Sequence, residues 1–370
     1  MRVVLFSNTL NHYMQAVSEA FFERLGDQYA FVENAALDEE RKALGWKSID
    51  APYLKRSAAM SRQELAQLLM ESDFVIFGAV PFSLVKPRLN MERLSFFYTE
   101  RVLKKGDGPF VFLPRWLKYR NVFGSVKHCS LLAIGSRCAS DFERMGLFSG
   151  RRFAWGYFPA VRQLADKDGL FDDKEPASIV WAGRFIDWKH PELLLYGAKR
   201  LREKGLSFRV TMVGGGALLP EMEELAKKLG LGETVSFTGP VPPEAVRGYM
   251  EKSEIFVHTA GRDEGWGVVL QEAMNALCTP VVKRDMGAAE CLIGDRVSGR
   301  FYRDEQELAV ILEELLTNRE KTRSMALKGC AGLEELWNPK TAADRFLETA
   351  RAMERGEALP VYGDGPMKCL

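Results

Sequence analysis

The fold is constrained most strongly by a regular alternation of short apolar runs and longer segments of helical period in the second half of the chain. The apolar runs occupy residues 178–183, 208–216, 235–239, 254–259 and 279–283. Runs of this length, bounded by turn-forming residues, are typical of strands buried on both faces of a parallel sheet. Prolines fall where the intervening helices would begin, at Pro191, Pro220, Pro242 and Pro243. The sequence therefore predicts a series of β-α units.

The first half shows the same alternation in a less regular form. Strands are predicted at 2–7, 74–79, 131–136 and 153–158, and a helix at His12–Leu25. Residues 159–176 do not continue this alternation and are rich in charged residues, Gly and Pro, which indicates a linker. Because 370 residues exceed what one hydrophobic core usually serves, we expect two domains.

The predicted fold is α/β, with two Rossmann-like parallel-sheet domains. The first domain would span 1–158 and the second 177–338, and a C-terminal helix with a loose tail at 339–370 would pack back toward the first domain. Open sheets of this kind bind ligands at the carboxyl ends of their strands, so we expect the two domains to face a cleft there.

The overall composition excludes several classes of protein. Hydrophobic residues at 46% and charged residues at 27% are ordinary for a globular protein, and a net charge of +1 argues against a nucleic-acid-binding surface. Six scattered cysteines lack the spacing of a zinc site or a disulfide framework, which favours a reducing cytoplasm. The sequence has neither the apolar core of a signal peptide nor the roughly 20 apolar residues of a membrane span.

Two glutamates, Glu264 and Glu272, lie in the stretch EGWGVVLQEAM. Glu264 follows the predicted strand 254–259, and Glu272 falls on a helical face that is otherwise small or apolar. A buried carboxylate requires partners, and the vicinal hydroxyls of a nucleotide-sugar could supply them. Gly265 and Gly267 would permit close approach of a ligand. The alternative is that Glu264 interacts with the helix dipole and Glu272 is a half-exposed surface residue.

Two cations follow the first strand of this half. Arg184 comes just after 178–183, and Lys189 lies five residues later, before the helix that begins at Pro191. At the carboxyl end of a neighbouring strand, both cations would face the same cleft as Glu264. They would neutralise a diphosphate bound there.

Together these motifs resemble the donor domain of retaining glycosyltransferases with the GT-B fold, specifically glycosyltransferase family 4 (glycosyl transferases group 1). The shared pattern is a Gly-Arg after a strand with a Lys shortly after, a glycine loop, a V-x-F-x-G strand and an E-x7-E motif. In this sequence the pattern is carried by Gly183, Arg184 and Lys189, by VGGG at 213–216, by Val235, Phe237 and Gly239, and by Glu264 to Met274. Trp266 stands where the family more often has Phe.

The resemblance implies a role for each matched position. Arg184 and Lys189 would bind the diphosphate, Glu272 the nucleotide ribose, and Glu264 the donor sugar. Arg184, Lys189 and Glu264 are the catalytic residues expected in this half. The other expected donor-binding residues are Gly183, Gly214, Gly215, Gly239, Val241, Gly265, Trp266, Gly267 and Val268. The family uses side-chain cations in place of Mg²⁺, so neither a metal nor another cofactor is expected.

The first half matches the family less clearly. The family often places a histidine from this domain near the donor sugar, and the corresponding region here, 95–106, contains none. Glu100 or Arg101 could take that place, or His12 could reach in from the first loop. The alternatives are that His12 bonds the backbone at a helix start and that Glu100 is a solvated charge.

Aromatic residues recur at helical spacing between cations in 110–127, at Phe112, Trp116, Tyr119 and Phe123. In one interpretation the aromatic rings belong to the core and the cations are solvated. In the other, the segment presents a basic aromatic face to an anionic membrane, which predicts a peripheral membrane contact, a lipid-linked acceptor and a location at the inner face of the membrane.

The sequence thus predicts a retaining, metal-independent glycosyltransferase that moves a sugar from a nucleotide diphosphate sugar to an acceptor hydroxyl. The setting would be the synthesis of a surface polysaccharide or glycolipid. The expected partners are the nucleotide-sugar donor and a carbohydrate or lipid-linked acceptor, with no nucleic acid. Two alternatives are a nucleotide-sugar epimerase of the same fold and a non-catalytic nucleotide-sugar-binding scaffold protein.

Overall fold

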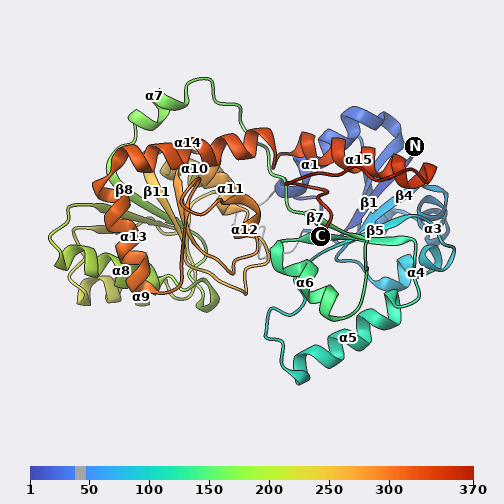
Figure 1. The fold of residues 1–370 in the computed structure, drawn as a ribbon, viewed down its shortest axis with the longest axis horizontal. Coiled ribbons are helices and arrows are strands. Elements are labelled where there is room, and N and C mark those ends of the chain that lie inside the picture. Colours follow the sequence, from blue (N-terminus) through green and yellow to red (C-terminus); the bar gives the residue numbers. More distant parts are fainter. Residues whose placement is uncertain (38–46) are drawn as a thin grey trace. The chain divides into compact units, whose positions relative to one another are not determined.

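The computed structural model describes residues 1–37 and 47–370, and these residues form two compact units (Figure 1). One unit comprises Met1–Ala160 together with Leu336–Leu370, and the other comprises Val161–Glu335. We call them the N-terminal unit and the C-terminal unit. Each contains a parallel sheet with helices as crossovers, which confirms the predicted fold class.

The sheet of the N-terminal unit has the strand order β3-β2-β1-β4-β5-β6-β7, and every neighbouring pair is parallel. Its strands are β1 (Val3–Ser7), β2 (Tyr29–Glu33), β3 (Leu54–Arg56), β4 (Phe74–Phe77), β5 (Ser95–Glu100), β6 (Cys129–Ile134) and β7 (Arg152–Trp155). Its helices are α1 (His12–Leu25), α3 (Arg62–Glu71), α4 (Phe82–Asn90), α5 (Pro109–Phe123), α6 (Ser136–Arg144) and α15 (Pro339–Arg355). The sequence analysis did not predict β2, β3 and β5.

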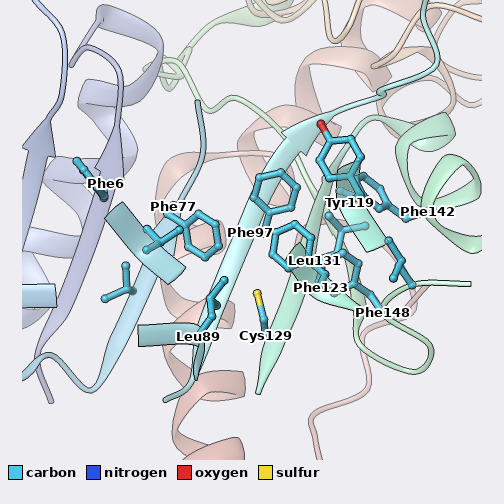
Figure 2. Packing of buried hydrophobic residues seen from close by; sticks show 14 of the residues in the cluster. Phe6, Phe77, Leu89, Phe97, Tyr119, Phe123, Cys129, Leu131, Phe142 and Phe148 are labelled. Carbon is cyan, nitrogen blue, oxygen red and sulfur yellow. The ribbon is translucent and has the colours of Figure 1, made fainter. Parts of the chain in front are cut away.

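The core of the N-terminal unit lies between one face of its sheet and the helices packed on that face. Figure 2 shows Phe77 and Phe97 on neighbouring strands facing Phe123 of α5, with ring centroids of Phe97 and Phe123 4.9 Å apart. Tyr119 of α5 stacks edge-on against Phe142 of α6 at 5.2 Å. These contacts fix which side of α5 faces the core.

Four aromatic residues of the segment 110–127 therefore lie on the core side, as in the first of the two sequence interpretations: Phe112, Trp116, Tyr119 and Phe123. Tyr119 and Phe123 are buried, and Phe112 and Trp116 pack partly buried against the same cluster. They do not form an outward basic aromatic face, because burial of four large rings is more favourable than exposure of them.

Residues 336–370 complete the N-terminal unit. Phe346 of α15 packs against Phe96 with ring centroids 4.7 Å apart, and Arg24 of α1 donates to Asp344 at 2.9 Å. Beyond α15 the chain is not a loose tail, contrary to expectation. Its backbone pairs with β7, since the amide of Ala154 donates to Lys368 and the amide of Leu370 donates to Arg152. This pairing covers an edge strand that would otherwise present free backbone groups.

The sheet of the C-terminal unit has the order β10-β9-β8-β11-β12-β13 and is also parallel. Its strands are β8 (Glu175–Ala182), β9 (Arg209–Val213), β10 (Val235–Phe237), β11 (Ser253–His258), β12 (Thr279–Lys283) and β13 (Arg300–Tyr302). Its helices are α7 (Lys167–Asp172), α8 (Glu192–Glu203), α9 (Leu219–Lys228), α10 (Pro243–Lys252), α11 (Val269–Asn275), α12 (Ala289–Leu292), α13 (Glu305–Thr317) and α14 (Arg319–Glu335). Of these strands only β13, three residues long, has no counterpart in the sequence analysis.

The segment expected as a linker, 159–176, contains ordered structure. It holds α7 and the first residues of β8. The side chain of Asp166 accepts a hydrogen bond from the amide of Gly169 at 2.9 Å and so caps α7. Phe171 is buried in a small cluster with Ala326 of α14, so α7 packs onto the C-terminal unit. The sequence of 159–176 therefore resembles a linker because most of its residues are polar or charged, although Phe171 is buried and fixes the helix in place.

Candidate functional site

Three glycine-containing loops meet at the carboxyl ends of β8, β9 and β10. The amide of Gly214 donates to the carbonyl of Gly239 at 3.2 Å, and the amide of Phe185 donates to that of Gly215 at 2.9 Å. A Cβ at Gly214 would overlap the carbonyl oxygen of Gly183, and its φ of +131° also favours glycine. These contacts bring Gly183, Gly214, Gly215 and Gly239 together, and their role in donor binding stays a prediction.

The loop after β8 carries both predicted cations. Arg184 is exposed, and Lys189 ends a short 3-10 turn at Asp187–Lys189 with 13% of its side chain accessible. The loop is fastened to β11, because Thr259 donates to the carbonyl of Lys189 at 2.5 Å and itself accepts from the indole of Trp181 at 2.8 Å. These two hydrogen bonds hold Lys189 beside the loop that follows β11, the neighbouring strand of the sheet.

Lys189 forms an ion pair with Glu264, and both side chains are largely buried. His258, the last residue of β11, lies behind the pair, with its Nε2 3.7 Å from Oε2 of Glu264. Burial and the charge of Lys189 lower the pKa of His258 to about 4, against the opposing effect of Glu264. The imidazole is therefore neutral near pH 7, and Lys189 and Glu264 supply the charges of this cluster.

The loop from Glu264 to Val268 is held by backbone hydrogen bonds from the segment that follows β12. The amide of Gly287 donates to the carbonyl of Glu264 at 3.1 Å, and a Cβ at Gly287 would overlap the carbonyl oxygen of Gly265. Gly267 has a φ of +85° and little space around it. Trp266 is buried, and its indole donates to Gln271 at 2.7 Å. The Trp266 side chain thus packs in the interior, and its carbonyl accepts from the amide of Ala288 at 3.0 Å.

Glu272 lies in the first turn of α11 and is half-buried. Across the described residues its carboxyl group makes neither a hydrogen bond nor an ion pair, and Arg247 of α10 acts on it only from beyond ion-pair distance. Burial raises the pKa of Glu272 to about 7, and Arg247 opposes the rise. A carboxyl group in this state is costly when ionised, and hydrogen-bond donors from a ligand would reduce that cost.

The remaining predicted positions lie nearby or in the other unit. Val241 is half-buried in the connection between β10 and α10. His12 is the first residue of α1, whose N-terminus is capped by the Asn11 side chain. Glu100 ends β5, where it pairs with Lys104 and accepts from Tyr157 at 3.1 Å. Glu100 is therefore not a freely solvated charge, and a catalytic role for His12 or Glu100 stays a prediction.

Two residues near the site were not singled out by sequence. His258 stands near the end of the predicted strand 254–259, and this position indicates that it would lie beside the loop that follows. Arg247 gave no such signal, since its position depends on how α10 packs against α11. It donates to the side chain of Asn275 at 3.1 Å and to Glu251 at 2.6 Å.

Other features bear on what the chain could bind. In the parts of the chain that the structure describes, no three His, Cys, Asp or Glu side chains gather in a way that could hold a metal ion. Within residues 1–37 and 47–370, no helix has both the length and the apolar character needed to cross a bilayer.

The chain is similar to known proteins in both sequence and structure. Residues 163–329 match the family model for glycosyl transferases group 1. A D-inositol 3-phosphate glycosyltransferase of Nocardia farcinica is 32% identical over 184 residues, which cover 47% of this chain and 40% of that protein. A GDP-mannose-dependent alpha-(1-6)-phosphatidylinositol monomannoside mannosyltransferase of Mycobacterium tuberculosis is 25% identical over 350 residues, which cover 85% of this chain and 86% of that protein.

The first relatives are matched over only part of their length, with 40%, 50% and 37% covered. Among solved structures, Anabaena HepE in complex with UDP superimposes with a TM-score of 0.71 at 14% identity, covering 95% of this chain and 100% of that one. The sucrose-phosphate synthase of Thermosynechococcus elongatus gives a TM-score of 0.68 at 13% identity, covering 96% and 100%. The chain therefore has the GT-B fold, and its C-terminal unit matches the glycosyl transferases group 1 family over residues 163–329.

Proposed function

We propose that the chain is a retaining glycosyltransferase that moves a sugar from a nucleotide diphosphate sugar to an acceptor hydroxyl. The observation that carries the proposal is the largely buried pair of Lys189 and Glu264 after β8 and β11, with the exposed Arg184 in the same loop as Lys189. The family match over 163–329 and the names of the sequence relatives support the same class of reaction.

The difficult event in such a reaction is the departure of the nucleoside diphosphate. Negative charge grows on its distal phosphate as the bond to the anomeric carbon breaks. Arg184 and Lys189 would stabilise that charge, and one preorganised donor of this kind contributes about 3 to 4 kcal/mol. Because these cations carry the positive charge, we expect the reaction to proceed without a metal ion.

The ion pair between Lys189 and Glu264 gives donor binding a specific consequence. A diphosphate competes with Glu264 for Lys189, because it offers more negative charge than one carboxylate. Once released from Lys189, Glu264 would accept hydrogen bonds from the sugar hydroxyls. The pair would thus hold both groups in place before the donor arrives, and the exchange of partners would couple phosphate binding to sugar binding.

Glu272 would bind the ribose of the nucleotide. Its carboxyl group lacks a hydrogen-bond partner among the described residues, and the vicinal ribose hydroxyls would donate two bonds to it. Hydrogen bonds to the ionised form lower a pKa. Since the pKa of Glu272 is raised to about 7 before binding, nucleotide binding should release a proton near neutral pH.

Retention at the anomeric carbon requires no protein nucleophile in the proposed reaction. The bond from the anomeric carbon to the phosphate oxygen breaks, and the bond to the acceptor oxygen forms on the same face of the sugar. The acceptor proton passes to the departing phosphate oxygen. The M. tuberculosis relative is named for a glycolipid acceptor, which supports a lipid-linked or carbohydrate acceptor here, in surface polysaccharide or glycolipid synthesis.

Calorimetric titration of the whole chain against UDP, GDP, ADP and their common sugar conjugates, in EDTA, tests the proposal. We expect one nucleotide to bind, and its affinity to fall about tenfold or more in Arg184→Ala and Glu272→Ala, because each removes a charge-assisted contact. Glu264→Gln should bind the free nucleotide at least as tightly as the parent, since Lys189 is no longer paired, while it loses turnover.

The outcomes separate this proposal from its alternatives. Failure of every nucleotide to bind would contradict it. Binding without transfer to any sugar or glycolipid acceptor would favour a scaffold, and conversion of the donor sugar to its epimer without an acceptor would favour an epimerase. The configuration of the transferred sugar, read by NMR, decides whether the anomeric centre is retained.

A further inference from the structure

Helix α5 carries an apolar stripe on the side that points away from the core. Phe110 is 95% exposed, Leu113 53% and Leu117 55%. Spacings of three, four and seven residues place these side chains on one helical face, with the exposed Pro114 among them. Single exposed apolar residues are ordinary, whereas a contiguous stripe of them marks a contact surface.

The stripe cannot be buried by rotation of the helix about its axis. The opposite face of α5 carries Tyr119 and Phe123, which are buried among the rings of the N-terminal core (Figure 2). Figure 1 shows α5 at the periphery of its unit. Its exposed apolar side therefore remains available to another surface.

Cations border the stripe on both sides. At 100° per residue, Lys118 lies about 80° from Phe110 around the helix axis, and Arg120 lies about 80° away on the other side. The ammonium of Lys118 lies over the Tyr119 ring at 5.4 Å, and the guanidinium of Arg120 lies over the Trp116 ring at 5.0 Å. These contacts hold both cations along the flanks. Helix α5 contains no acidic residue.

Three other strongly exposed apolar side chains of the described residues lie in different surroundings. Val310, 59% exposed, lies on α13 among the acidic residues Glu305, Glu307, Glu313 and Glu314. Val297 and Val361, 55% and 96% exposed, lie in connecting segments outside the helices. The combination of an apolar stripe with cationic flanks distinguishes α5 from these sites.

We propose that the outer face of α5 docks on an anionic lipid surface. Phe110, Leu113 and Leu117 enter the boundary between headgroups and acyl chains, and Lys118 and Arg120 contact the lipid phosphates. Charge decides against a second copy of this chain as the occupant, because pairing two such faces would oppose cations to cations. The contact needs no nucleotide-sugar, so it holds or fails independently of the proposed function.

Flotation of the whole chain with vesicles tests the proposal. One set of vesicles is phosphatidylcholine alone, and the other contains about one third phosphatidylglycerol. We expect binding to the anionic vesicles and much weaker binding to the neutral ones. The variant Phe110→Ser/Leu113→Ser/Leu117→Ser should lower the partition coefficient about tenfold or more, because it removes the apolar contact.

A matched variant, Val297→Ser/Val310→Ser/Val361→Ser, removes three exposed apolar side chains elsewhere and should bind as the parent does. Replacement of Lys118 and Arg120 by Gln should weaken binding to anionic vesicles by roughly fivefold per cation and leave binding to neutral vesicles unchanged. High salt should reproduce this second effect. All substituted positions are exposed, and circular dichroism verifies that each variant is folded.

Three results would overturn the proposal. One is that the parent chain does not bind anionic vesicles. Another is that the serine variant of α5 binds them as well as the parent does. The third is self-association of the parent, seen by analytical ultracentrifugation and lost in the α5 variant, which would make the stripe a protein-protein interface.

Discussion

The two sheets of this protein share a topology and differ at the carboxyl ends of their strands. In both, the first six strands follow the spatial order third, second, first, fourth, fifth, sixth. The C-terminal unit places glycine loops, the Lys189–Glu264 pair and Glu272 at this edge, and among the described residues the Glu272 carboxyl has no hydrogen-bond partner. The loops that follow the strands, and not the sheet itself, therefore distinguish the two units.

At the corresponding edge of the N-terminal sheet, several polar side chains contact one another. The hydroxyls of Ser7 and Tyr98 are hydrogen-bonded, and Glu100 pairs with Lys104. Asp141 accepts from Arg101 at 3.1 Å and from the backbone amide of Val102 at 2.9 Å. The same topology thus supports an edge with glycine loops and the Lys189–Glu264 pair, and an edge at which Glu100 and Asp141 are paired with side chains of their own unit.

The largest expected effect comes from removing one lysine at each edge. Lys189→Met should lower kcat by about 10²- to 10³-fold with a smaller change in donor affinity, because the cation stabilises charge that develops as the diphosphate leaves. Lys104→Met, which removes the corresponding partner of Glu100, should change kcat less than about threefold, as expected for a surface pair of little energetic weight.

Steady-state kinetics on both variants checks this contrast. If Lys104→Met lost as much turnover as Lys189→Met, the edge of the N-terminal sheet would also take part in the chemistry, and Glu100 would become the first residue to examine. Equal effects of the two substitutions would therefore contradict the claim that the carboxyl edges of the two sheets differ in their role in the reaction.

A smaller effect is expected from adding a methyl group at a crowded glycine in each unit. A Cβ at Gly287 would overlap the backbone of the Gly265 loop, and a Cβ at Gly78 would overlap the backbone of Tyr98. Both Gly287→Ala and Gly78→Ala should lower the free energy of unfolding by about 3 kcal/mol. Only Gly287→Ala should also weaken nucleotide binding, since it displaces the loop that carries Glu264.

Denaturant titration and calorimetry measure these two quantities. Gly332→Ala, in the interior of α14 with nothing near the added carbon, serves as the control and should stabilise by about 1 kcal/mol. Unchanged nucleotide affinity in Gly287→Ala would show that the loop tolerates displacement.

The smallest expected effect is a pH dependence of stability at Glu272. Its folded-state pKa of about 7 lies above the ordinary value of 4.5, so the folded state binds the proton more strongly between these values. Stability should then fall as pH rises from 4.5 to 7, by about 1 to 2 kcal/mol after allowance for solvent access. Glu272→Gln should lack this fall and should be the more stable protein at pH 8.

His258 opposes this trend, so the parent protein alone cannot show it. The pKa of His258 is lowered to about 4, and its neutral form makes stability rise with pH between 4 and 6.5. The difference in denaturation midpoint between Glu272→Gln and the parent, measured at pH 5 and pH 8, isolates the glutamate. A difference that does not change with pH would contradict a raised pKa.

Most of the C-terminal unit could be predicted because its sequence obeys local rules. Apolar runs, first-turn prolines and glycine loops each indicate the backbone conformation at their own positions. These signals were enough to locate β8 to β12. The strands that went unpredicted lack such signals. In the N-terminal unit, β2 begins immediately after a short 3-10 turn that follows α1, so that its apolar run merges with the helical pattern.

The individual residues of the candidate site could be predicted from the sequence, whereas the contacts between them could not. The E-x7-E spacing indicated Glu264 and Glu272, but the ion pair with Lys189 and the proximity of His258 depend on neighbouring strands that are distant in sequence. Helix α5 shows a similar limit. It has apolar residues on two faces, and only packing against Phe97 and Phe142 decides that Tyr119 and Phe123 face inward and Phe110 outward.

The return of residues 336–370 to the N-terminal unit has a consequence for synthesis on the ribosome. The C-terminal unit is contiguous, so it is complete once residue 335 has left the exit tunnel. The N-terminal unit emerges first yet lacks α15 and the pairing of β7 with residues 367–370 until the last of these appears. The half made first is thus the half finished last, and its nascent form must wait, with Phe21 and Phe96 uncovered, for Phe346 to arrive.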